Sequence, residues 1–305
     1  MQLTEAQHKK YRAALWSLIV IVVLFWAKVM WFNRPQLMSD DLGDAYRMYL
    51  PNLQFYFQAI ARGEFPLWNP YELAGLPFVA VLEFGPYYPL TGLYAIFSLS
   101  NAHVISTGLH ILILAVGCYK LNGTSLRLHP VAALLGALAM VVCGWSILRA
   151  PMFMDALRSM AYLPWVLLAA DNIVRKPSAL ASAAFGMLLA LQFLAGETEI
   201  SVRTGFIIAP FVVFRLFVLR KELPNSLNRT ARIGAALFAG GFYALGISAV
   251  QWIPTLEATA QSVRETGTLT FMQTQNGGHQ TYSALANLLT TSSDLLNVYY
   301  VGVPV

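Results

Sequence analysis

Charged side chains are scarce in this sequence of 305 residues, of which only 11% are Asp, Glu, Lys or Arg. Soluble proteins carry roughly 25% charged residues, so the composition excludes an ordinary soluble enzyme. Hydrophobic residues make up 57% of the chain and the mean hydropathy is +0.56, which excludes a disordered chain as well. Cysteine is nearly absent. Cys118 and Cys143 both lie in apolar runs, where neither a disulfide framework nor a thiolate zinc site is expected.

Motifs for nucleotides and metals are missing too. The sequence contains no glycine-rich phosphate loop and no Gly-x-Ser-x-Gly turn, so it does not support use of a nucleotide sugar at the inner face. No histidine spacing is typical of zinc; His103 and His110 stand seven residues apart on one apolar run. The formal charge of +5 comes from basic residues scattered between apolar runs, which argues against nucleic acid as a partner. No cofactor is predicted, and a divalent metal stays open.

What the sequence does contain is apolar runs of membrane-spanning length, about 20 residues. Seven runs qualify: residues 13–32, 102–121, 130–148, 156–174, 179–195, 200–219 and 233–253. An eighth run, 87–99, is shorter and carries Pro89 and Gly92, which favours an interfacial or re-entrant segment. The first run lacks a small-residue cleavage site, so we expect a membrane helix rather than a signal peptide.

The distribution of charge decides between seven and eight spans. With seven spans and a cytoplasmic N-terminus, 12 of the 20 basic residues lie in the inner segments and 12 of the 15 acids lie in the outer ones. An eighth span would invert everything after it and lose this positive-inside bias. The sequence therefore predicts an all-α polytopic membrane protein with about seven transmembrane helices.

Two larger segments then lie on the outer side. Residues 33–101 form a first outer loop within a transmembrane module of residues 1–254, and residues 255–305 form an outer tail. The chain closes on Tyr299-Tyr-Val-Gly-Val-Pro-Val305, a sequence typical of the approach to a further span. We expect this chain to be the N-terminal part of a longer protein.

The first outer loop opens with three carboxylates close to the membrane surface, Asp40, Asp41 and Asp44. Behind Ser39 they suit a helix N-terminus, where acids favour the helix dipole. Alternatively one of them is a general base, because neighbouring carboxylates can raise a pKa toward neutrality. Residues 45–61 have helical spacing with one apolar stripe, which predicts an amphipathic helix at the membrane surface. Glu83 is a further acid of this loop.

One part of the loop resembles a known family. Gly63-Glu-Phe-Pro-Leu-Trp-Asn-Pro-Tyr71, then Ala74-Gly-Leu-Pro-Phe78 and Tyr87-Tyr-Pro89, is similar to the first outer loop of the bacterial YfhO family, within the GT-C superfamily of membrane glycosyltransferases. Gly196-Glu-Thr-Glu199 resembles that family's Gly-His-Pro-Gln-type turn with both middle residues changed, and Pro254–Glu257 with Ser262–Arg264 resembles the segment after its seventh span. Only the Pro-Leu-Trp-Asn-Pro stretch is distinctive.

The resemblance implies a GT-C-like fold in a bacterial plasma membrane. It also implies transfer of a sugar from a polyprenyl-phosphate donor to an envelope glycan or lipid acceptor on the outer face. A first-loop acid would be the catalytic base; by position Asp40 comes first and Asp41 second, with Asp44 nearby. Trp68, Asn69 and Glu83 of the matching loop would contact the substrate.

Several ionisable residues lie at the expected outer ends of spans. They are Arg149, Asp155, Arg158, Glu197, Glu199 and Arg203, with Arg264 in the tail. One interpretation is ordinary helix ion pairing, Asp155 with Arg158 and Glu199 with Arg203. The other is a substrate site in which the arginines hold the phosphate of a lipid-linked sugar.

Two other function classes remain beside the transferase. A transporter or flippase would need broken helices and deep ionisable groups. Pro164 and Pro210 interrupt two runs, but the deep positions are nearly all apolar. An inactive structural subunit would keep the fold without the chemistry.

Overall fold

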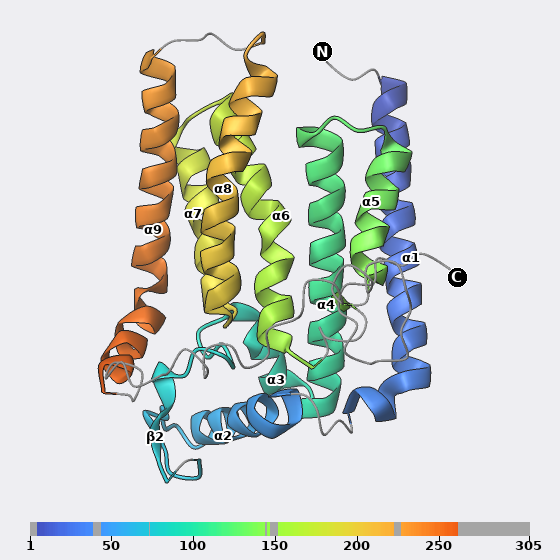
Figure 1. The fold of residues 1–305 in the computed structure, drawn as a ribbon. Helices are drawn as coiled ribbons and strands as arrows, with labels where there is room; N and C mark the ends of the chain where they lie inside the picture. Colours follow the sequence, from blue (N-terminus) through green and yellow to red (C-terminus); the bar gives the residue numbers. More distant parts are fainter. Residues whose placement is uncertain are drawn as a thin grey trace, which may run out of the picture.

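The computed structural model describes residues 5–38, 44–72, 74–143, 145–146, 152–222 and 227–261. Within these ranges, seven helices of 13 residues or more stand side by side (Figure 1). They are α1 (Glu5–Met38), α4 (Leu99–Lys120), α5 (Pro130–Val142), α6 (Met154–Arg175), α7 (Ala179–Leu194), α8 (Thr198–Leu219) and α9 (Leu227–Ala260). Each of the seven apolar runs falls on one of these helices.

Four of the helices are long and apolar enough to cross a membrane, counted over the described ranges: α1 within Gln7–Lys28, α4 extended to Ser125, α8 and α9. Helices α5 and α7 are apolar but have only 13 and 16 residues, or about 20–24 Å at 1.5 Å per residue. Helix α6 has 22 residues, but it carries two acids and two arginines near its ends. The chain is thus a largely helical protein with the character of a membrane protein.

The run 130–148 was expected to be one continuous helix, but α5 ends at Val142. Cys143 leaves the helix in an extended conformation. The Cys143 thiol and the Ser146 hydroxyl both donate to the Met140 carbonyl, at 3.2 and 2.5 Å. These two bonds satisfy a carbonyl that a helix end leaves open, so the helix stops within an apolar sequence.

From the sequence, Pro164 and Pro210 were expected to interrupt their apolar runs, but neither proline breaks its helix. Pro164 lies inside α6 and Pro210 inside α8, and both helices continue past them. The run 87–99 is divided between two four-residue helices, η3 (Pro89–Gly92) and α3 (Leu93–Ile96), with α4 starting at Leu99.

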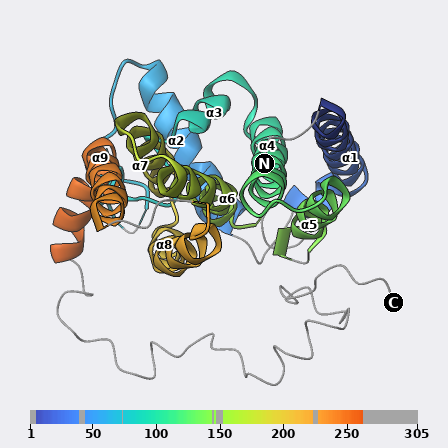
Figure 2. The ribbon, with the colours of Figure 1, turned by 90° about the horizontal axis from the view of Figure 1, so that it is seen from above.

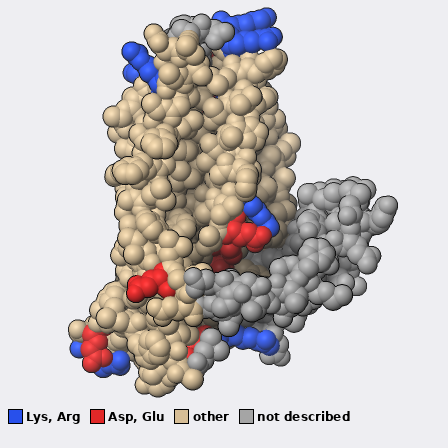
Figure 3. Space-filling view, turned by 60° about the vertical axis from the view of Figure 1, so that its left-hand side comes forward, with Lys and Arg blue, Asp and Glu red and all other residues tan. Residues whose placement is uncertain are grey.

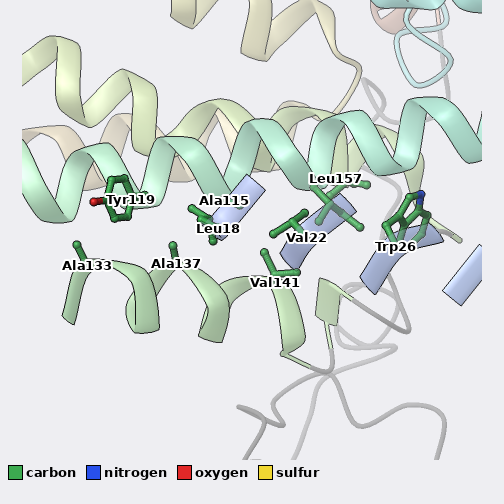
Figure 4. Close-up of a cluster of buried hydrophobic side chains, with 10 residues drawn as sticks. Leu18, Val22, Trp26, Ala115, Tyr119, Ala133, Ala137, Val141 and Leu157 are labelled. Carbon is green, nitrogen blue, oxygen red and sulfur yellow. The ribbon is translucent and has the colours of Figure 1, made fainter. Parts of the chain in front are cut away.

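Seen along the bundle, α9, α7, α6, α4 and α1 follow one another in a row, with α8 packed on α6 and α5 packed on α1 and α4 (Figure 2). Figure 4 shows the core at the α1 end of this row. Leu18 and Val22 of α1 are buried against Ala115 of α4 and Ala137 and Val141 of α5. Alanines at these positions let the helices approach closely.

A close backbone contact lies at the other end of the row, between α7 and α9. A Cβ atom on Gly186 would lie 2.3 Å from the backbone oxygen of Gly240, and one on Gly240 would lie 2.8 Å from the Ser182 oxygen. Only residues without a side chain allow this approach of two backbones.

The described part of the expected first outer loop folds over the lower end of the bundle in Figure 1. The π-helical turn η1 (Ala45–Tyr49) leads into α2 (Leu50–Ala61), which lies across the bundle end, so the helix expected over residues 45–61 is confirmed. A short hairpin follows, β1 (Trp68–Asn69) paired antiparallel with β2 (Leu76–Pro77), and then the 3-10 turn η2 (Phe78–Ala80). Gln251 and Thr255 of α9 donate to the carbonyls of Val79 and Ala80. These bonds fasten the loop to the bundle.

Charge is distributed unequally between the two ends of the bundle. On the face drawn in Figure 3 the visible acids lie toward the lower end together with some Lys and Arg, while the upper end shows Lys and Arg without visible acids. The upper charges include a buried ion triad, in which Asp171 of α6 accepts from Nε of Arg175 and Nε of Arg215 at 2.8 and 2.7 Å. An exposed pair, Arg127 with Glu222, joins two loops at the same end. Three arginines of the upper end, Arg127, Arg175 and Arg215, are therefore held in ion pairs.

Candidate functional site

Three chain segments converge where the outer loop meets the lower end of the bundle. The segment 82–88 enters with Phe84 and Tyr88 buried, the N-terminus of α6 follows, and the turn between α7 and α8 closes the group. Gly196, in the turn between α7 and α8, allows the three segments to approach one another. Its φ is +121°, and a Cβ atom would lie 2.7 Å from the backbone oxygen of Glu83 and 3.1 Å from Cβ of Asp155. A side chain here would push the segments apart.

Asp155 lies at the centre of this junction, one residue before the apolar run 156–174. It is only 3% exposed. Its Oδ1 accepts from the backbone N–H of Ala156 at 2.8 Å, and the Tyr49 hydroxyl hydrogen-bonds to the same carboxyl. Burial, with the nearby carboxylates of Glu197 and Glu83, raises the pKa of Asp155 to about 7. These two hydrogen bonds favour the charged form and only partly offset the burial.

A carboxyl with a pKa near 7 can both accept and release a proton at neutral pH, which is what general acid–base chemistry requires. Tyr49 takes part in the same arrangement, since burial and the neighbouring Asp155 raise the pKa of its hydroxyl. The hydroxyl therefore stays protonated and acts as a donor to the carboxylate.

Arg158 lies one turn further along α6 and is 1% exposed. Its guanidinium stands over the rings of Tyr88 and Tyr94, with 5.8 and 5.6 Å from Cζ to the ring centroids. Nη1 donates weakly to the Phe84 carbonyl at 3.4 Å, whereas Nε and Nη2 find no hydrogen-bond partner among the described residues. Cation–π contacts offset part of the cost of burying this charge. The two open donors suit an anionic oxygen or a water molecule.

A hydrogen-bonded row of side chains runs from this arginine into the bundle. The Tyr88 hydroxyl lies 2.7 Å from that of Tyr162 and 2.6 Å from Nε2 of His110, whose Nδ1 lies 2.6 Å from the Ser106 carbonyl. A carbonyl oxygen only accepts, so Nδ1 carries a hydrogen. In a neutral ring Nε2 then accepts from Tyr88, and Tyr88 accepts from Tyr162.

The expected ion pairs have different outcomes. Glu199 and Arg203 form the predicted pair, and both side chains are 66% exposed. Asp155 and Arg158 do not pair, because the guanidinium lies against Phe84 and the two tyrosine rings instead. Three polar residues of the long helices, His110, Arg158 and Gln192, are buried inside the protein. Hydropathy averages over a helix and does not show these single polar positions.

The structure brings together only part of the predicted site. Glu83 and Glu197 lie beside Asp155, and Glu197 caps α8 by accepting from the backbone N–H of Glu199 at 3.0 Å. Asp44 precedes η1 and lies close enough to influence Tyr49. Four predicted residues, Asp40, Asp41, Arg149 and Arg264, lie outside the described residues.

Trp68 and Asn69 are placed in the hairpin rather than at the junction. The Trp68 ring covers Gly75, where a Cβ atom would lie 2.5 Å from Cζ2. Asn69 is buried and donates to Asn52 of α2 at 3.1 Å. Both residues therefore shape the outer loop itself.

Sequence reasoning considered Asp155 only as a pairing partner and did not assign a role to Tyr49, His110 or Tyr162. Asp155 had one usable signal, an acid directly before an apolar run and three residues from an arginine. His110 had none, because its partner Tyr88 is 22 residues away along the chain. In the described residues, no three His, Cys, Asp or Glu side chains gather in a way that would hold a metal ion.

Comparison with known proteins adds no relative. No protein-family model matches this chain, and neither the curated proteins nor the solved structures contain a match. The interpretation of the junction around Asp155 therefore depends on its geometry alone.

Proposed function

We propose that this protein is a membrane glycosyltransferase that moves a sugar from a polyprenyl-phosphate donor to an envelope glycan or lipid on the outer face. The observation that carries the proposal is the buried carboxyl of Asp155, whose pKa is raised to about 7 beside Glu83 and Glu197. It lies where a loop folds over one end of an apolar helix bundle. The loop sequence that resembles the YfhO and GT-C proteins supports the same function.

The orientation is part of the proposal. The apolar runs on the seven long helices, which begin after Asp155 in the case of α6, lie in a bacterial plasma membrane, with the N-terminus in the cytoplasm and the α2 end outside. The excess of Lys and Arg at the other end supports this direction. Asp155 at the start of α6 and Glu197 at the start of α8 then lie at the level of the lipid head groups, where a lipid-linked phosphate is also found.

In the proposed reaction an acceptor hydroxyl attacks the anomeric carbon of the donor sugar. The new glycosidic bond forms as the bond from carbon to phosphate oxygen breaks, with inversion, and polyprenyl phosphate leaves. A carboxylate takes the hydroxyl proton. Asp40 is the first candidate for this base and Asp41 the second, with Asp44 close by; Asp155 joins them because its pKa suits proton transfer at neutral pH.

The leaving phosphate needs a positive partner. Arg158 supports this role because two of its donors are open and it lies directly inside the junction. Arg203 is less suited since Glu199 already pairs with it on the surface. Arg149 and Arg264 remain candidates on sequence grounds.

A transporter or flippase is the second candidate, and the buried row from Tyr162 to His110 is the observation in its favour. Against it, α6 and α8 run through Pro164 and Pro210 without the break that half-helix binding sites require. Transferase and transporter make different predictions for the fate of the donor sugar. Only a transferase forms a new covalent product.

The test is sugar transfer from radiolabelled polyprenyl-phosphate donors by membranes containing the protein. Wild type is compared with Asp40→Asn, Asp41→Asn and Asp155→Asn, each of which keeps the side-chain shape and removes the base. Glu257→Gln, on the exposed end of α9, is the matched control. Loss of transfer in one Asp variant with normal membrane insertion identifies the base. Wild-type transfer no higher than that of empty membranes, with every donor, refutes the proposal.

A further inference from the structure

The outer loop contains a hollow of about 400 Å³ between α2 and the turn after β1. One wall is a polar face of the η1–α2 segment and its C-cap, formed by Arg47, Gln54, Gln58 and Arg62. Their spacing of seven, four and four residues places them on one side of a helix. Tyr71 and Glu72 form the facing wall. This face points away from the apolar side of α2, whose Leu53 is fully buried.

The floor of the hollow is a fixed network of amides. Asn52 is buried and its Nδ2 donates to the Met48 carbonyl and to Oε2 of Glu72, both at 2.8 Å. Asn69, also buried, donates to Oδ1 of Asn52 and accepts from the backbone N–H of Tyr71 at 3.0 Å. These bonds hold the Glu72 carboxylate and the Tyr71 backbone in place before any ligand arrives. Such support is what a preorganised binding site needs.

Tyr71 is an exposed aromatic ring at the rim of this polar hollow. Its side chain is 85% exposed, and the edge of the Phe55 ring contacts it at a centroid distance of 5.9 Å. An exposed ring beside amides and a carboxylate fits a ligand with both C–H faces and many hydroxyls. A purely apolar ligand would leave the polar wall unpaired. A simple anion would meet Glu72 as well as Arg47 and Arg62, and it would make no use of the exposed Tyr71 ring.

We infer that this hollow is a saccharide-binding site that holds the glycan part of the acceptor. The inference rests on the proposed transferase function in one respect, the assignment of the bound saccharide to the acceptor. The sugar stacks on Tyr71 while its hydroxyls bond to Gln54, Gln58 and Glu72. The η1–α2 segment that forms the wall also carries Tyr49 to Asp155, so one element joins the saccharide site to the buried carboxyl.

Saturation-transfer NMR tests binding directly and does not require catalysis. The probes are maltotetraose, chitotetraose and mannotetraose, each added at millimolar concentration to the full chain in detergent. At least one should show saturation transfer in wild type. Tyr71→Ala should weaken it about tenfold, a loss equivalent to about 1.4 kcal/mol, and Gln58→Ala should weaken it in the same direction. Tyr46→Ala is the matched control, because Tyr46 is an exposed tyrosine of the same segment that does not line the hollow.

Absence of saturation transfer from all three probes overturns the inference, as does equal binding by Tyr71→Ala and wild type. Kinetic measurements of sugar transfer by the same variants separate this inference from the proposed function. If Tyr71→Ala raises KM for the acceptor and leaves KM for the donor unchanged, the site holds the acceptor. If the protein binds a saccharide but transfers no sugar, the saccharide site is supported and the transferase function is refuted. If the protein transfers sugar and Tyr71→Ala does not change the transfer, the transferase function is supported and the assignment of the hollow to the acceptor is refuted.

Discussion

Replacing Asp155 by Asn should make the protein more stable at alkaline pH. The pKa of this carboxyl is 3.8 in its ordinary state and about 7 in the folded protein, with burial as the largest cause. The folded state therefore binds the proton more tightly than the unfolded state, and folding loses stability as pH rises from about 4 to about 7. A difference of roughly three pKa units corresponds to about 4 kcal/mol at most. Asn carries no charge, so it avoids this penalty.

The substitution should keep the local contacts. The Asn oxygen can still accept from the Ala156 N–H, and its amide group can still bond to Tyr49. Wild type should thus show an apparent Tm that falls between pH 5 and pH 8, whereas the fall should be much smaller in Asp155→Asn. At pH 8 the variant should unfold several degrees above wild type.

Thermal unfolding in detergent, followed by intrinsic tryptophan fluorescence across this pH range, provides the measurement. Glu257→Gln controls for the loss of an exposed acid. An Asp155→Asn variant that is less stable than wild type at pH 8, or that keeps the wild-type pH dependence, would refute the account of this carboxyl.

Three further substitutions test the packing. Gly186→Leu should lower Tm strongly, because the new Cβ would lie 2.3 Å from the Gly240 oxygen; Gly241→Ala, with nothing within 4 Å of its Cβ, should have a small effect, and equal effects would contradict the contact. Tyr88→Phe should cost about 1–3 kcal/mol, since it leaves His110 and Tyr162 without their shared partner; Tyr87→Phe is its control in the same unfolding assay. Gly196→Ala should lower Tm at every pH because it separates Glu83 from Asp155, and an unchanged Tm would contradict the close approach.

Hydropathy was sufficient to locate the long helices. Six of the seven apolar runs coincide with helices of the bundle, the seventh does so up to Val142, and the amphipathic segment 45–61 forms η1 and α2. The end of α5 could not be predicted, because it depends on Cys143 and Ser146 both donating to the Met140 carbonyl within an apolar sequence. The average hydropathy of the run does not reveal these two hydrogen bonds.

The junction around Asp155 was harder to predict for a different reason. Spacing along one helix suggested that Asp155 pairs with Arg158, and it could not reveal that Phe84 and Tyr88, some 70 residues earlier in the chain, surround the guanidinium. The same limit applies to the hollow in the outer loop. Its polar face repeats along α2, but Asn69 and Tyr71 face it only because the hairpin folds back.

The most direct test of the central claim is sugar transfer by membranes that contain either the wild type or a variant in which Asp40, Asp41 and Asp155 are all replaced by Asn. We expect radiolabel from a polyprenyl-phosphate donor to enter an envelope product with wild type and to remain in the donor with the triple variant. Equal transfer by the two proteins would contradict the claim that a carboxyl at this end of the bundle performs the chemistry.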